Sequence, residues 1–242
     1  MATEIELAVM AGRAYQSTRD RDTNWFPAPD PETWTEMEHT SEPSGFEAVY
    51  FQRGTGANKE IVISFAGTYD KDNMGDIATD IALGAGLFAM QLLQAAEYYL
   101  QVKAENPDVQ ITLAGHSLGG GLAALVGVFF GVNAVTFDQA PFRKTAECHY
   151  PESPNNDPCA VLLSVLQYNQ IDQSLLQPLE EYVAAMRQGY LGVLQDREDD
   201  VWNIRVDGEF LSGIFPVSKV DFIGTTSPAD VLTHGATDLS GI

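Results

Sequence analysis

The sequence predicts an α/β protein with a mostly parallel central sheet flanked by helices on both faces. Short apolar runs typical of strands alternate with longer helical patterns from residue 46 to residue 224, which favours parallel strands joined by helices. The run "VQITLAG" (109–115) is nearly all apolar, as expected for a strand covered on both faces. At 242 residues, the chain has the length for a single domain over 1–242 with a sizeable core.

The elements follow from these patterns in chain order. Expected helices cover 4–16, 76–105 (as one helix or two), 118–130 and 160–195, the last with a boundary at Pro178. Expected strands cover 46–52, 60–67, 109–115, 133–137, 200–207 and 218–224, and the first two form a hairpin. Residues 17–44 are polar and proline-rich, and we expect a long ordered loop there.

The charge balance excludes several partners. Thirteen Lys+Arg against 34 Asp+Glu give a net charge of −21, spread along the chain rather than gathered in a tail. Such a surface repels nucleic acid, so none is expected as a partner. Acidic residues stand where a secretory signal would carry basic ones, which predicts a cytoplasmic protein or one exported by a non-classical route. The charge-free stretch 81–96 is shorter than the roughly 20 residues of a membrane span, so we expect a buried helix and no transmembrane segment.

Cys148 and Cys159 enclose a loop rich in proline and asparagine. Two interpretations stay open: a disulfide that pins the loop, which would indicate an oxidising compartment, or a pair of free thiols. His149 alone beside them does not complete a ligand set, so we expect no metal site.

The stretch "LAGHSLGGGLAALVG" (113–127) contains the candidate nucleophile. Ser117 stands between Gly115 and Gly119, after a predicted strand and before a predicted helix. This is the pattern of a nucleophile elbow, a sharp turn that exposes a serine hydroxyl at the C-terminal edge of a sheet. The alternative is a glycine-rich turn with an incidental serine. His116 is expected to pack rather than act as a base.

A serine needs a base, and the base needs an orienting carboxylate. His234 is the one histidine after the last predicted strand, and the alternative is a surface histidine near the C-terminus. Asp207 ends the strand 200–207 and is our candidate acid, while Asp138, after the strand 133–137, is the main competitor.

Acyl transfer also needs donors for the oxyanion. The backbone N–H of Leu118, the residue after the serine, supplies one. The stretch "SFAGTYD" supplies the other at Thr68, through its N–H or its hydroxyl.

These motifs make the chain resemble the class 3 lipases, the fungal triacylglycerol lipase-like branch of the α/β-hydrolases. The matching pieces are "IVISFAGTYD" with Asp80, "ITLAGHSLGGGLAAL" and "AVTFDQAPF". The resemblance implies an α/β-hydrolase fold, Thr68 as the side-chain oxyanion donor and a lid over residues 70–90. The chain departs from the family at Ala66, where an arginine is usual.

The sequence therefore predicts a cofactor-free serine hydrolase of carboxylic esters, acting on acylglycerols or related lipids through an acyl-enzyme. Ser117, His234 and Asp207 form the expected triad, and the lid would contact lipid interfaces transiently. A phospholipase or polyester hydrolase would use the same residues. The alternative from another class is a non-catalytic module that binds a ligand through a hydrolase fold.

Overall fold

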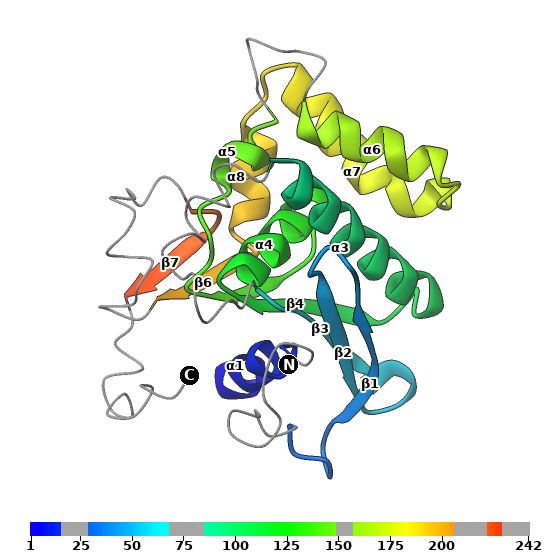
Figure 1. Cartoon of the computed structure of the whole chain (residues 1–242), viewed down its shortest axis with the longest axis vertical. Helices are drawn as coiled ribbons and strands as arrows, with labels where there is room; N and C mark the ends of the chain where they lie inside the picture. Colours follow the sequence, from blue (N-terminus) through cyan, green and yellow to red (C-terminus); the bar gives the residue numbers. More distant parts are fainter. Residues whose placement is uncertain (16–28, 68–84, 149–156, 206–221, 229–242) are drawn as a thin grey trace.

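A computed structural model describes residues 1–15, 29–67, 85–148, 157–205 and 222–228. Within these ranges the strands form one seven-stranded sheet in the order β1 to β7 (Figure 1). The first pairings, β1 with β2 and β2 with β3, are antiparallel, and every pairing from β3 to β7 is parallel. The predicted α/β class with a mostly parallel sheet is confirmed.

The strands are β1 Thr35–Ser41, β2 Glu47–Arg53, β3 Glu60–Phe65, β4 Gln110–His116, β5 Ala134–Phe137, β6 Val201–Arg205 and β7 Thr225–Pro228. The helices are α1 Glu4–Arg13, α3 Ala85–Glu105, α4 Leu118–Phe130, α5 Arg143–Ala146, α6 Pro158–Tyr168, α7 Gln173–Arg187 and α8 Gly192–Glu198, with a 3-10 turn η1 at Gly56–Asn58. None of the described helices is long and apolar enough to cross a bilayer.

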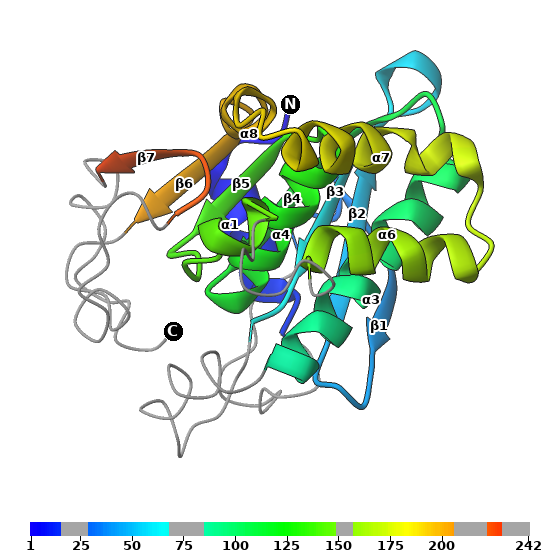
Figure 2. The same ribbon diagram turned by 90° about the horizontal axis from the view of Figure 1, so that it is seen from above.

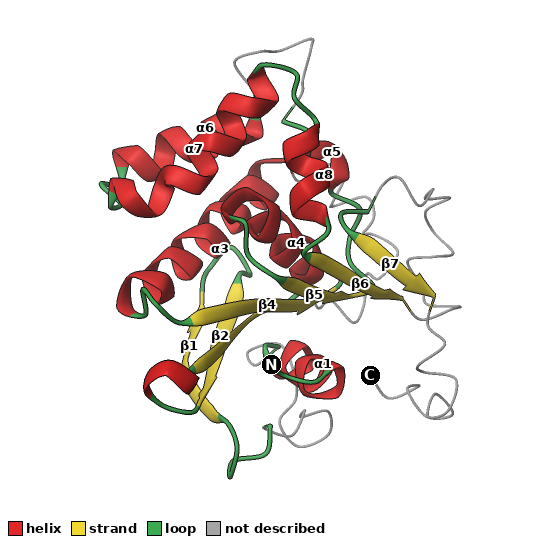
Figure 3. Cartoon of the chain, turned by 180° about the vertical axis from the view of Figure 1, so that it is seen from behind, coloured by secondary structure: helices red, strands yellow, loops and turns green. Residues whose placement is uncertain are grey.

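Helices cover both faces of the sheet. Helix α1 lies on one face, and α3 to α8 lie on the other (Figures 2 and 3). The larger apolar core joins the sheet to α3, α4, α6 and α7, and a smaller one joins it to α1. Every residue of α4 is buried, so the helix that follows the serine lies in the middle of the larger core.

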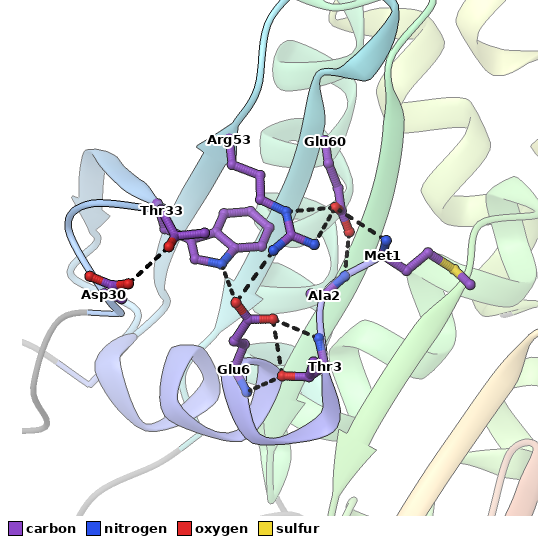
Figure 4. Close-up of polar contacts among 9 residues, drawn as sticks. Met1, Ala2, Thr3, Glu6, Asp30, Thr33, Arg53 and Glu60 are labelled. Carbon is purple, nitrogen blue, oxygen red and sulfur yellow. Dashed lines mark hydrogen bonds and ion pairs between the residues drawn. The ribbon is translucent and has the colours of Figure 1, made fainter.

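Polar contacts hold the start of α1 against the sheet (Figure 4). Thr3 and Glu6 form a reciprocal capping box, and the indole N–H of Trp34 donates to Glu6 at 2.8 Å. Arg53 on β2 stacks over Trp34 with its Cζ 4.4 Å from the ring centroid, and pairs with Glu6 and with Glu60 on β3. Partial burial opposes ionisation of Glu6, yet these hydrogen bonds and the Arg53 charge hold its pKa below its ordinary value.

Some of the expected boundaries were wrong. Strand β1 lies inside 17–44, where we expected only loop, and its polar residues occupy an edge of the sheet paired on one side. Pro178 lies inside α7 rather than at a helix boundary, because a buried apolar stripe on α7 outweighs the roughly 3 kcal/mol that a helical proline costs. The last strand of the described residues is Thr225–Pro228; residues 222–224, which we expected to end a strand, precede it, and 218–221 lie outside the described residues.

A disulfide joins Cys148, after α5, to Cys159, in the first turn of α6. The free-thiol interpretation is therefore wrong. Together with Asp157 these sulfurs are the closest group of metal-ligating residue types in the described part of the chain. The sulfurs are bonded to each other, and the Asp157 carboxylate accepts the N–H groups of Cys159 and Ala160 as a helix cap. The two sulfurs and the carboxylate therefore already have partners within the fold.

Replacing both cysteines, as Cys148→Ser with Cys159→Ser, should lower the free energy of unfolding by about 2.5 kcal/mol. The bond closes a short loop, with a sequence separation of 11, and loops of this length give stabilisation of roughly that size. Urea unfolding with and without a reductant measures the effect. The reductant should destabilise the wild type and leave the double variant unchanged. Equal midpoints for all samples would contradict the prediction.

Candidate active site at Ser117

The backbone at Ser117 is strained. Strand β4 ends at His116 and α4 begins at Leu118, so Ser117 alone makes the turn, with φ 55° and ψ −123°. Residues other than glycine rarely adopt positive φ, and such strain gathers at functional sites. The Ser117 N–H donates to the Phe137 carbonyl at 3.0 Å, and the Ser117 carbonyl accepts the N–H of Ala140 at 2.9 Å. The turn is thus braced by the end of β5 and the residues that follow it.

The two flanking glycines are required by close backbone packing. A Cβ on Gly115 would lie 2.8 Å from the nitrogen of Gly120, and it would collide with the Gly119 carbonyl group. A Cβ on Gly119 would lie 2.6 Å from the carbonyl carbon of Ala66, at the end of β3. Real Cβ atoms do not approach backbone this closely, so the sharp strand-to-helix turn expected at Ser117 is present.

The backbone after β3 reaches the first turn of α4. A Cβ on Gly67 would lie 3.3 Å from the Leu118 nitrogen and 2.9 Å from the His116 carbonyl oxygen. The first N–H groups of a helix have no partner within the helix and carry its positive dipole end. The Leu118 nitrogen therefore lies beside Gly67, the residue before Thr68. Thr68 itself lies outside the described residues.

His116 contacts Tyr15, which follows α1. The Tyr15 hydroxyl lies 3.0 Å from His116 Nδ1 and 3.3 Å from its carbonyl oxygen. Tyr15 is 4% exposed, and a Cβ on Gly67 would collide with its hydroxyl. The far end of α1 thus supports both segments that converge on the serine turn.

The structure places one of the two candidate acids. Asp138 directly follows β5, after the register pair His116–Phe137, so it lies at the same sheet edge as Ser117. It is 8% exposed, with φ 45°. Asp207, His234, Asp80 and most of the expected lid (70–84) lie outside the described residues.

The other described histidine outside the serine motif is His39. It lies within β1, and its Nε2 is 3.1 Å from the carbonyl oxygen of Ala14. The start of α3, which would continue the lid, packs Phe88 against Phe142 with ring centroids 4.2 Å apart.

A buried polar chain beside the serine turn was missed by the sequence analysis. Gln139, next to Asp138, donates from Nε2 to Thr136 Oγ1 at 3.2 Å, and Thr136 donates to Asn203 Oδ1 on β6 at 3.1 Å. All three side chains are at most 1% exposed. The signal was available, because threonine and asparagine interrupt the otherwise apolar runs "AVTF" (134–137) and "VWNI" (201–204).

An ion pair lies near the start of β7. Glu198, at the end of α8, pairs with Arg143 on α5 and accepts the N–H of Gly224. Burial raises the pKa of Glu198 above its ordinary value, and the Arg143 guanidinium and the hydrogen bonds offset part of that rise. The pair attaches the segment before β7 to the helical layer.

Comparison with known proteins agrees with this geometry. Residues 6–169 match the family described as phospholipase-like, Tle-like phospholipase domain. A putative lipase ATG15 of Eremothecium gossypii is 52% identical over 60 residues, which is 24% of this chain and 11% of that protein. An extracellular phospholipase A1 of Serratia liquefaciens is 40% identical over 91 residues, 37% of this chain and 27% of that protein.

This chain therefore aligns with about a tenth of the Eremothecium gossypii protein and about a quarter of the Serratia liquefaciens protein. Among solved structures, a lipase from Rhizopus microsporus var. chinensis is 18% identical with a TM-score of 0.42, over 58% of this chain and 60% of that one.

A mostly parallel sheet with a strained serine turn between strand and helix is the arrangement of the α/β-hydrolases, as the sequence motifs predicted. The match over residues 6–169 covers more than half of the chain and includes Ser117. The chain belongs to the Tle-like phospholipase domain family.

Replacing Gly119 by alanine should prevent the serine turn from forming as described. The new Cβ would meet the backbone of Phe65 and Ala66, and backbone cannot move aside without separating β3 from α4. We expect a loss of about 3 kcal/mol in the free energy of unfolding, measured by urea denaturation.

Gly192→Ala is the matched control. There the atoms nearest to the Cβ would be in the ring and hydroxyl of Tyr190, an exposed side chain that can rotate away. Equal stability of the two variants would contradict the close packing at the serine turn.

Proposed function

We propose that the protein is a serine hydrolase that cleaves carboxylic esters of lipids through an acyl-enzyme. One observation carries the proposal: Ser117 occupies a strained strand-to-helix turn, with the Leu118 N–H beside it and the backbone of Gly67 packed against that N–H. A serine with incidental placement would not need positive φ and three glycines at close backbone approach.

In this proposal the Ser117 hydroxyl oxygen attacks the ester carbonyl while His234 takes its proton. The carbonyl oxygen gains the negative charge and accepts hydrogen bonds from the Leu118 N–H and from Thr68. The intermediate collapses, the alcohol leaves with the proton from His234, and the acyl group stays on Ser117. Water, deprotonated by His234, then releases the carboxylic acid and restores the hydroxyl.

Asp207 orients His234 and stabilises its charged form in this proposal. Strands β4, β6 and β7 run parallel, so residues that follow their C-terminal ends gather at one edge of the sheet. Asp207 follows β6 and His234 follows β7, in the chain order Ser–Asp–His of this fold. Asp138, already at that edge after β5, is the alternative acid.

The proposed substrates are acylglycerols, with the ester bond near a lipid interface that the segment 70–90 would contact as a lid. Phospholipids are the second candidate, and the family match favours them: both the matched domain and the Serratia liquefaciens relative are described as phospholipases. Parallel assays on triacylglycerol and on diacyl phospholipid, with the same enzyme sample, separate the two.

Ser117→Ala and His234→Ala should each lower kcat on a p-nitrophenyl ester by about 10⁴-fold or more, because nucleophile and base act as a unit. The double variant should be no worse than either single one. Turnover is measured by release of p-nitrophenol, and the folded state by circular dichroism.

Ser164→Ala is the matched control, since that exposed hydroxyl donates to the carbonyl of Ala160 within its own helix. His39→Ala and His149→Ala should keep most activity. An active Ser117→Ala variant would contradict the mechanism. A wild type that binds lipid without turnover would instead support the non-catalytic hydrolase-fold module.

A further inference from the structure

The peptide group between His116 and Ser117 is held at both ends. Its N–H, on Ser117, donates to the carbonyl of Phe137 at 3.0 Å. Its carbonyl oxygen, on His116, accepts the hydroxyl of Tyr15 at 3.3 Å. The plane of this peptide sets the direction from which the chain enters the turn, where Ser117 has a φ of 55°. Strained backbone persists only where the surrounding structure fixes it, so the contact with Tyr15 bears directly on the nucleophile.

The imidazole of His116 completes the contact with Tyr15. Its Nδ1 lies 3.0 Å from the hydroxyl oxygen. A tyrosine hydroxyl carries one hydrogen and can also accept a hydrogen bond. Both contacts form together when Nδ1 carries a hydrogen and donates to the hydroxyl oxygen, which in turn donates to the carbonyl. The imidazole therefore sets the direction in which the Tyr15 hydroxyl points.

The same hydroxyl touches the backbone that follows β3. A Cβ on Gly67 would collide with it, and that Cβ would lie 2.9 Å from the His116 carbonyl oxygen and 3.3 Å from the Leu118 nitrogen. The Tyr15 hydroxyl, Gly67 and the first residue of α4 thus meet at one point, at the sheet edge where Ser117 lies. The hydroxyl therefore helps to set the spacing between the Gly67 backbone and the Leu118 N–H.

Tyr15 is itself held by elements away from the serine. Its ring is 4% exposed and lies in the smaller apolar core between α1 and the sheet. The two residues before it are attached to β1: Arg13 pairs with Glu36 at 3.0 Å, and the carbonyl oxygen of Ala14 lies 3.1 Å from His39 Nε2. The position of the hydroxyl is therefore fixed independently of the turn that it contacts.

We propose that Tyr15 is a positioning residue for the nucleophile, whose hydroxyl fixes the His116–Ser117 peptide and the spacing between Gly67 and the Leu118 N–H. The inference rests on the proposed function, because it takes Ser117 as the nucleophile and the Leu118 N–H as an oxyanion donor. These backbone groups bind the tetrahedral intermediate more strongly than the substrate, so Tyr15 acts on turnover more than on binding. A shift of about 1 Å in a reacting group can cost about 10²-fold in rate.

The test is Tyr15→Phe, which keeps the ring and its packing and removes the hydroxyl. We expect kcat on a p-nitrophenyl ester to fall by about tenfold, with KM changed little. The affinity for an alkylboronic acid, which binds a serine nucleophile as a tetrahedral adduct, should fall by a similar factor, because the adduct resembles the transition state. A merely structural role would lower the unfolding midpoint and leave kcat and this affinity unchanged.

Tyr182→Phe is the matched control for loss of a buried tyrosine hydroxyl. Tyr182 is fully buried, and its hydroxyl donates to the carbonyl of Ala146 at 2.6 Å. Its ring packs against Phe129, at the opposite end of α4 from Ser117, with centroids 5.4 Å apart. The variant should lower the unfolding midpoint and leave kcat and the boronic acid affinity within about twofold of the wild type, as expected for a distant site.

His116→Leu tests the same contact from its other side, and it is read in place of Tyr15→Phe if that protein does not fold. It removes Nδ1, which orients the Tyr15 hydroxyl, so kcat should fall with KM unchanged. His116→Asn places an amide nitrogen where Nδ1 stands and should recover most of the lost turnover.

Wild-type kcat in the folded Tyr15→Phe variant, or in His116→Leu, overturns the inference while Ser117→Ala remains inactive. An equal loss of kcat in Tyr182→Phe overturns it as well, because the loss would then follow stability and not position. An active Ser117→Ala variant overturns the proposed function instead.

Discussion

Backbone packed directly on backbone at the serine turn is the constraint on which the rest of the structure depends. Gly115, Gly119 and Gly67 bring the ends of β3 and β4 and the start of α4 so close that no side chain fits between them. Positive φ at Ser117 costs on the order of 1–3 kcal/mol. The buried helix α4 behind the turn offsets that cost, because all of its residues leave water when it packs against the sheet.

The sequence predicted the centre of the fold well and its edges poorly, for a physical reason. Strands β3 and β4 are covered on both faces, so nearly all of their residues are apolar. Such a short apolar run predicts a buried strand. Strand β1, "TEMEHTS", is a polar edge strand. Edge strands carry charged residues, so their sequences resemble those of loops. In the last strand the apolar residues misled us: Phe222 and Ile223 are buried in the segment before β7, whereas β7 itself is "TTSP".

For the turn at Ser117, the local motif predicted the geometry because close backbone packing requires glycine at fixed positions. The glycines around Ser117 are present because the backbone packs too closely for a Cβ. The position of the Leu118 N–H follows from the start of α4 at that residue. The hydrogen bond from Gln139 to Ile223 was missed because Ile223 is distant in sequence and meets Gln139 only through the order of strands in the sheet. The choice between Asp207 and Asp138 is of the same kind, since neighbours across strands decide it and spacing along the chain does not.

The most direct test of the central claim, that the turn at Ser117 presents an activated nucleophile, is reaction with a fluorophosphonate followed by mass-spectrometric peptide mapping. Only a serine whose proton is taken by a base reacts readily with this probe. The account predicts one phosphonyl group per chain, on the peptide that contains Ser117. A folded, unlabelled protein, or a label on another residue, would contradict it.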